Sequence, residues 1–169
     1  GICVPGLCRH YYDANFWPKK IESTNDEMTL RFLEDHIVMV PLAPRRPGCS
    51  VVEGKDITPV KVKALADAAK ACWTAIIAHD LRGFAAAFKA SFNAQVAMFP
   101  GMVNPDIYGQ PCPEASVEPY IQKYSSMPDV LAWKLSGAGG GGYLALVVED
   151  AKAFCGEHSE MIELHIRRA

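Results

Sequence analysis

The sequence lacks any run of basic residues and any long run of apolar residues. Lysine and arginine together number 17 against 19 acidic residues, which gives a formal net charge of −2. A nucleic-acid-binding surface usually needs a basic stripe, so we expect no nucleic-acid partner. The longest apolar stretches, such as 143–148, are far shorter than the roughly 20 residues that cross a bilayer, so we also expect no membrane partner.

The sequence also lacks the spacings that are typical of metal and disulfide sites. No CxxC pair occurs, and the five histidines do not cluster with the cysteines. A zinc site needs closely spaced pairs of ligands, and a disulfide framework is typical of shorter chains. We therefore expect no metal site and reduced thiols, as in a cytoplasmic protein, rather than a redox or metal centre. The six cysteines are Cys3, Cys8, Cys49, Cys72, Cys112 and Cys155.

An initiator methionine and a signal peptide are absent from the start of the sequence. The chain begins Gly-Ile-Cys-Val-Pro, directly in an apolar stretch. A secretory signal would need a charged region followed by a hydrophobic segment. This start indicates a processed product or an excised fragment, and we favour the fragment. The 169 residues fit one domain, 1–169, that is long enough to bury a core.

Hydrophobic periodicity predicts strands in the first part of the chain and helices in its middle. Residues 2–12 predict a strand and a turn, with a hairpin tip at 13–15 before Phe16-Trp17, whereas 22–27 is polar and expected to be exposed. Residues 37–40 predict a buried strand that is ended by prolines. Spacings of three and four residues predict three helices: one containing Val62, Leu65, Ala69, Cys72, Trp73 and Ile76; one over 81–99, capped by Asp80; and one over 114–124.

The last third of the sequence returns to strand periods. It predicts a half-buried strand over 131–135, a central strand over 143–148, a helix over 149–155 closed by Gly156, and an edge strand in which Leu164 and Ile166 face inward. The order of elements predicts an α+β fold. Its natural closure is a two-layer sandwich, with helices on one face of a mainly antiparallel sheet.

The most informative segment is the glycine-rich connection 137–142 between two predicted strands. Four consecutive glycines carry a large entropic cost, and a hairpin needs only one or two. The excess predicts positive φ angles or close approach by another group, and backbone N–H groups there could bind an anion. The GxGxxG match is not a dinucleotide fingerprint, because a strand follows it, and no Gly-Lys-Ser/Thr follows for a phosphate-binding Walker loop. The alternative is a hairpin whose only role is tight packing.

The segment Lys134–Leu146, KLSGAGGGGYLAL, resembles the third conserved motif of the GHMP kinases. This superfamily includes galactokinase, homoserine kinase and mevalonate kinase, and the similarity is greatest to its heptose-phosphate and fucose kinase branch. Tyr143 replaces the usual phenylalanine. Three other segments look like less specific parts of the family: 2–12, 37–45 and 91–107.

The resemblance implies the ferredoxin-like C-terminal lobe of a two-lobed kinase. Such an enzyme transfers a phosphoryl group from ATP to a hydroxyl of a sugar or sugar phosphate. The family's Pro-x-x-x-Gly-Leu-x-Ser-Ser-Ala phosphate loop does not occur in the sequence. The resemblance therefore implies that ATP and Mg²⁺ are bound mainly by the protein's own N-terminal lobe, missing here, from which residues 1–28 continue as a strand and hairpin.

The same resemblance assigns candidate site residues. No catalytic residue is expected in the chain, because the family's acidic residue would lie just upstream of Gly1. This chain alone should be inactive, and its exposed lobe surface could support a homodimer. The loop beside the nucleotide phosphates would be Gly137, Ala138, Gly139, Gly140, Gly141 and Gly142. The candidates for binding substrate are Arg45, Arg46, Gln95 and Ser136.

Each candidate has a plainer alternative. Arg45 and Arg46 could bind a phosphate or form a solvated basic loop. Gln95 could bind a sugar hydroxyl or be a hydrogen-bonded amide in the core, and Lys134 could contact phosphate or be solvated. For the whole chain, the alternative is a non-catalytic ligand-binding or interaction domain of the same fold. In the kinase interpretation, Gly140→Val should abolish activity and leave this domain folded.

Overall fold

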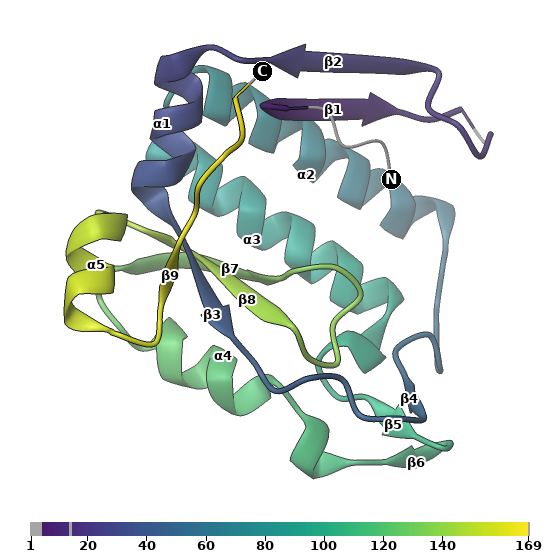
Figure 1. The fold of residues 1–169 in the computed structure, drawn as a ribbon. Coiled ribbons are helices and arrows are strands. Elements are labelled where there is room, and N and C mark those ends of the chain that lie inside the picture. The colour runs from purple at the N-terminus through teal and green to yellow at the C-terminus, as the bar shows by residue number, and fades with distance from the viewer. Residues whose placement is uncertain (1–4, 14, 169) are drawn as a thin grey trace.

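The computed structural model describes residues 5–13 and 15–168 (Figure 1). The strands are β1 (Leu7–Tyr11), β2 (Lys20–Thr24), β3 (Ile37–Pro41), β4 (Cys49–Ser50), β5 (Asp106–Ile107), β6 (Gln110–Pro111), β7 (Val130–Leu135), β8 (Tyr143–Val148) and β9 (Ile162–Glu163). The helices are α1 (Glu27–His36), α2 (Pro59–Ile77), α3 (Leu81–Met98), α4 (Glu118–Ser125) and α5 (Ala151–Glu157), with short 3₁₀ helices η1 (Pro100–Met102) and η2 (Pro113–Ala115).

The main sheet has four strands in the order β7-β8-β3-β9, and each neighbouring pair is antiparallel. In its centre Val38 of β3 lies opposite Leu146 of β8, which in turn lies opposite Trp133 of β7. The predicted α+β class and antiparallel sheet are therefore confirmed. The predicted strands over 37–40, 131–135 and 143–148 are all present in this sheet.

Both faces of the central strand β8 are covered, because Leu144–Val148 is buried throughout. Successive side chains of a strand point to opposite faces. The even-numbered residues join a cluster that contains Tyr124 of α4 and Phe154 of α5. Val147 joins a second cluster with Phe84 of α3. Helices α1, α2 and α3 contribute side chains to the Val147 cluster, whereas α4 and α5, with Phe92 of α3, contribute to the other, so helices supply side chains to both faces of the sheet.

Two smaller sheets flank the main one. β1 and β2 form the predicted hairpin, although residues 2–4 and Ala14 of the predicted strand and tip lie outside the described residues. Phe16 and Trp17 precede β2 without joining it, and their exposed fractions are 87% and 66%. The other small sheet has the order β4-β5-β6. It pairs the segment after β3 with the connection that follows α3.

Helix boundaries follow their capping residues. The Asp80 carboxylate accepts a hydrogen bond from Gly83 N at 3.0 Å and begins α3, as predicted. Asp26 caps α1 in the same way, a helix that the sequence patterns did not predict. The prediction was wrong in detail at three places: α4 begins at Glu118 after a 3₁₀ turn, Gly156 lies inside α5, and Val62 on α2 is exposed.

The C-terminal segment 164–168 contacts the β1–β2 hairpin, helix α1 and the hydrophobic core. Leu164 and Ile166 pack inward, as predicted, but they lie beyond the two-residue edge strand β9. Arg168 forms ion pairs with Glu27 and Glu34 of α1. Hydrogen bonds from Arg168 and then Arg31 lower the pKa of Glu27 to about 2.

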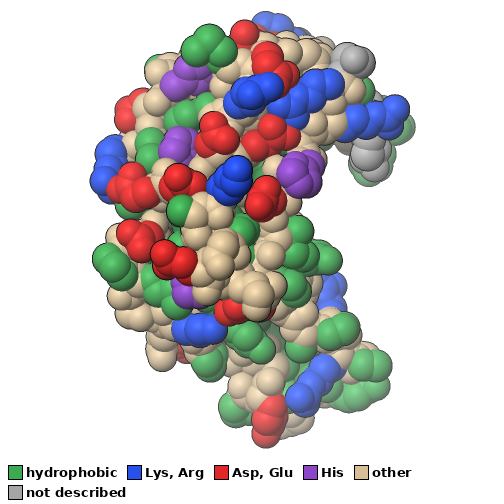
Figure 2. Space-filling model, turned by 60° about the vertical axis from the view of Figure 1, so that its left-hand side comes forward, with side chains coloured by type: hydrophobic (Ala, Val, Ile, Leu, Met, Phe, Trp, Pro, Cys, Tyr) green, Lys and Arg blue, Asp and Glu red, His purple; other side chains and the backbone are tan. Residues whose placement is uncertain are grey.

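The surface mixes charges of both signs. Figure 2 shows acidic and basic side chains interleaved on one face, and a hollow on one side between the upper and lower parts of the molecule. In Figure 1 the hairpin β1–β2 lies at the top and the β4–β6 sheet at the bottom. Among the described residues, no helix combines the length and the apolar character that a membrane crossing needs.

Candidate functional site

The glycine connection between β7 and β8 needs glycine for its backbone shape. The φ angles are +72° at Gly137, +79° at Gly139, +69° at Gly140, +138° at Gly141 and +90° at Gly142. L-residues rarely adopt these angles, because Cβ crowds the following carbonyl. The predicted positive φ angles are confirmed.

The close approach that the glycines allow is made by the protein's own backbone. A Cβ atom on Gly139 would lie 2.6 Å from the Met102 carbonyl oxygen, and one on Gly141 would lie 2.6 Å from that of Ala43. By contrast, Cβ atoms on Gly137 and Gly142 would have no neighbour within 4 Å. The connection therefore packs tightly at its centre and is open at its two ends.

Two N–H groups of the connection are used internally. Gly140 N donates to the Met102 carbonyl at 3.1 Å, and Gly142 N donates to the Ala43 carbonyl at 3.3 Å. Neither can serve an anion without breaking its bond to a carbonyl. A Cβ on Gly140 would also lie 3.0 Å from the Cys49 sulfur and 3.1 Å from Val51, so Gly140→Val would disturb packing as well as any function.

The two candidate arginines have different environments. Arg45 donates from Nε and Nη2 to the Gly139 carbonyl oxygen at 3.2 and 2.7 Å, so it holds the glycine connection in place. Arg46 lines a small cavity of about 70 Å³ together with Gly140 and Gly141. Its Nη1 also contacts the Cys112 sulfur at 3.9 Å. Both arginines are exposed, but of the two it is Arg46 that lines this cavity.

Lys134 on β7 is half-buried and is not a solvated strand lysine. Its ammonium donates to the Ser91 hydroxyl of α3 at 2.8 Å, and Ser91 donates to the Phe88 carbonyl at 2.8 Å. Burial lowers the pKa of Lys134, and burial raises the pKa of the nearby Cys72 thiol on α2 to about 11. The hydrogen bond from Lys134 to Ser91 links the sheet to α3, and Lys134 interacts electrostatically with Cys72 of α2.

The remaining two candidates lie apart from the small cavity. Ser136 is exposed at the end of β7, where its backbone N donates to the Tyr143 carbonyl at 2.9 Å. Gln95 on α3 has a buried Oε1 for which the described residues provide no hydrogen-bond partner. The expectation of a satisfied core amide is therefore wrong for this oxygen. Neither Ser136 nor Gln95 lines the cavity beside Gly140.

Sequence reasoning missed the opposite wall of that cavity. Glu114, Ser116 and Tyr120, from η2 to α4, face the glycine connection across it. No local motif marks these residues, and the only signal was the proline-containing connection that precedes them. The structure thus brings together Arg46, the centre of the glycine connection and the start of α4.

The described residues contain no group of three or more His, Cys, Asp or Glu side chains that could hold a metal ion. Within the glycine connection, the backbone is open to a ligand only near Gly137 and Gly142. Neither a scan against protein-family models nor a search of curated proteins found a match for the chain.

Proposed function

We propose that this chain is the C-terminal lobe of a cytoplasmic GHMP-type kinase that phosphorylates a sugar or sugar phosphate. The observation that carries the proposal is the position of the KLSGAGGGGYLAL segment. It forms the end of the edge strand β7, the glycine connection and the first part of β8, which lies inside the antiparallel sheet. The motif therefore has both the sequence and the strand-loop-strand setting that the resemblance implies.

The order of strands adds support. The four strands of the main sheet occur along the chain as β3, β7, β8 and β9. If they are numbered 1 to 4 in that order, their order across the sheet is 2-3-1-4. This is the order of a ferredoxin-like β-α-β-β-α-β sandwich. The α2–α3 pair, followed by α4, occupies the first helical connection, and α5 occupies the second.

In this proposal the lobe supplies a rigid wall rather than catalytic groups. Phosphoryl transfer depends mainly on positioning and charge neutralisation. Arg45 and the Met102 carbonyl hold the glycine connection rigid, and its open ends would face the phosphates bound by the other lobe. The exposed aromatic side chains Phe16 and Trp17 suit a surface that the other lobe covers.

A phosphoryl-transfer assay tests the proposal. The coding sequence upstream of Gly1 is read, and the longer protein and this chain alone are incubated with γ-labelled ATP, Mg²⁺ and a panel of sugars and sugar phosphates. We expect transfer by the longer protein only. Absence of a Ser-Ser-Ala phosphate loop upstream, together with absence of transfer, would favour the non-catalytic binding domain instead.

A matched pair of glycine variants separates function from folding. Gly137 and Gly109 have φ angles of +72° and +76°, and a Cβ on either has no neighbour within 4 Å. Gly137→Ala and Gly109→Ala should therefore lower stability equally, by about 1 kcal/mol. Only Gly137→Ala should slow phosphoryl transfer, and equal rates in the two variants would contradict the assigned role of the connection.

A further inference from the structure

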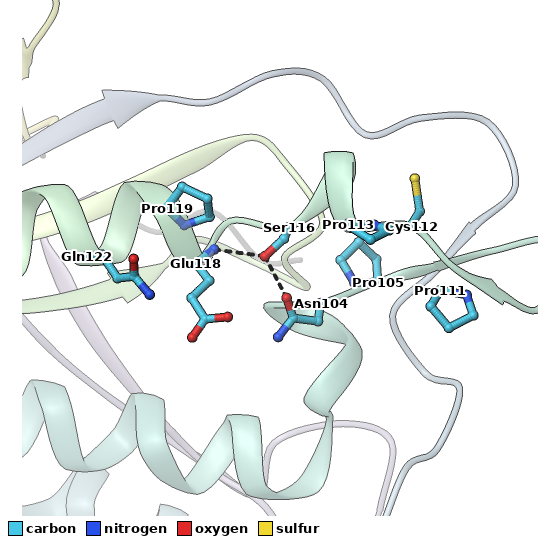
Figure 3. Close-up of a pocket in the computed structure, with 9 residues that line it drawn as sticks. All are labelled: Asn104, Pro105, Pro111, Cys112, Pro113, Ser116, Glu118, Pro119 and Gln122. Carbon is cyan, nitrogen blue, oxygen red and sulfur yellow. Dashed lines mark hydrogen bonds between the residues drawn. The ribbon is translucent and has the colours of Figure 1, made fainter.

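A second and larger cavity lies beside the small one. Its volume is about 420 Å³, and it opens between the connection that follows α3 and the start of α4 (Figure 3). Sites for small molecules commonly have volumes of roughly 300 to 1,000 Å³. Ser116 lines both cavities, so the larger one adjoins the small cavity that reaches Gly140 and Arg46.

Four prolines form much of the wall of this cavity: Pro105, Pro111, Pro113 and Pro119. Proline rings are rigid, so they hold an apolar surface open without losing side-chain entropy when a ligand binds. Such a surface suits the C–H face of a sugar ring. No lysine, arginine or histidine is among the residues that line the cavity. A phosphate group would therefore find no cation inside it.

The polar groups of the cavity are oriented by hydrogen bonds. Ser116 Oγ donates to Asn104 Oδ1 at 2.5 Å and accepts from Glu118 N at 3.2 Å. The Asn104 amide is thereby fixed with Nδ2 turned away from Ser116. Figure 3 shows this amide nitrogen directed toward the side where the Glu118 carboxylate and the Gln122 amide lie. The cavity thus presents hydrogen-bond donors and acceptors close together.

We infer that this cavity binds the ring of a monosaccharide. Each sugar hydroxyl is both a donor and an acceptor, which matches an amide N–H beside a carboxylate. Cys112 lines the cavity and contacts Arg46 at 3.9 Å, so a phosphate carried by the sugar would point toward Arg46. The role of this sugar as a substrate rests on the proposed function, whereas its binding is a property of this chain alone.

Ligand-observed NMR and calorimetry with the isolated chain test the inference. The probes are hexoses, 6-deoxyhexoses and heptoses, each with and without a phosphate, and glycerol serves as a polyol without a ring. Glu118→Gln and Gln122→Ala should each weaken binding of the preferred sugar, by about tenfold for Glu118→Gln, which alters hydrogen bonds of a charged group. Glu157→Gln, an exposed carboxylate on α5, is the matched control and should bind like the unaltered chain.

A variant of Arg46 tests whether phosphorylated and unphosphorylated sugars bind differently. Arg46→Met should weaken binding of the phosphorylated sugar and leave the unphosphorylated one unchanged. Circular-dichroism melting verifies that every variant is folded. The inference is overturned if no sugar binds, if glycerol binds as tightly as the sugars, or if neither Glu118→Gln nor Gln122→Ala weakens binding.

The outcome is separable from that of the kinase assay. If sugar binding depends on Glu118 but the longer protein does not transfer a phosphoryl group, the sugar site is supported and the kinase function is rejected. Transfer that is insensitive to Glu118→Gln and Gln122→Ala would keep the kinase and reject this site.

Discussion

The glycine connection 137–142 and the proline-rich segment 104–119 lie next to each other but use the backbone in opposite ways. Glycines let the first segment close onto the protein's own carbonyls, so its central residues are buried. Prolines keep the second segment open around a cavity of about 420 Å³. The most unusual segment of the sequence is therefore used largely for internal packing. The larger cavity lies beside it, where the residues are less distinctive.

The largest effect is expected at the centre of the glycine connection. Gly139→Ala combines a φ angle of +79° with a Cβ only 2.6 Å from the Met102 carbonyl oxygen. Strain and overpacking together should lower the free energy of unfolding by about 3 kcal/mol. Urea denaturation measures the change. Gly137→Ala, with open space, is the control at about 1 kcal/mol, and equal losses would remove the distinction between packed centre and open ends.

The next largest effect is expected at the contact that holds the connection. Arg45→Met removes two hydrogen bonds to the Gly139 carbonyl and should lower the free energy of unfolding by about 2 kcal/mol. Amide exchange near Gly139 should become faster. Arg46→Met is the matched control, because the Arg46 side chain makes a long hydrogen bond to the Cys112 sulfur and a minor electrostatic interaction with Glu114, and it should unfold like the unaltered chain. A larger loss for Arg46→Met would reverse the assignment of the two arginines.

A smaller effect is expected in the proline-rich segment. Ser116→Ala removes the hydrogen bond to Asn104 Oδ1 and one acceptor for Glu118 N, with a stability loss of about 1 kcal/mol or less. The prolines should keep the cavity open, so the segment should retain its shape. Urea denaturation and the chemical shift of the Asn104 amide report the two effects. A loss as large as that of Gly139→Ala would show that the open segment depends on cooperative packing as well.

The smallest effect concerns an exposed hydrogen bond in the same segment. The Cys112 thiol donates to Glu114 at 3.1 Å, and this bond is the main reason why the pKa of Glu114 lies below its usual value. A carboxyl with a lowered folded-state pKa stabilises the fold above its unfolded pKa and loses that contribution as the pH falls through the folded value. Cys112→Ala should therefore raise the pKa of Glu114, which carboxyl NMR titration measures, and leave stability at pH 7 nearly unchanged. An unaltered pKa would contradict the bond.

The sequence predicted much of the fold because its signals were local. Alternation identified β7, a continuous apolar run identified β8, and Asp80 marked the start of α3. The sequence did not predict the ten-residue helix α1, because only four of its residues are buried and its apolar pattern is therefore weak. The segment before it is polar. Its stability depends on contacts with α2 and on Arg168, which lies more than a hundred residues away.

The candidate site was predicted only in part for the same reason. Positive φ angles are a local property of the backbone, so the glycines in the sequence were enough to predict them. The groups that approach those glycines, the carbonyls of Met102 and Ala43, come from distant parts of the chain. The cavity around Ser116 is likewise assembled from a turn, a 3₁₀ helix and the start of α4, none of which carries a periodic pattern.

The contacts between the C-terminal segment and the start of the hairpin make this chain suitable for circular permutation. Gly6 N donates to the Arg167 carbonyl at 2.8 Å, and Figure 1 shows the C-terminal label beside β1. A short linker that replaces residues 1–5 could therefore join Gly6 to Arg168 at a small entropic cost. New termini could be opened at the exposed Tyr108-Gly109 turn between β5 and β6, far from the main sheet in sequence. Such a circular permutant would keep the four-stranded sheet intact, with its new ends inside the proline-rich segment.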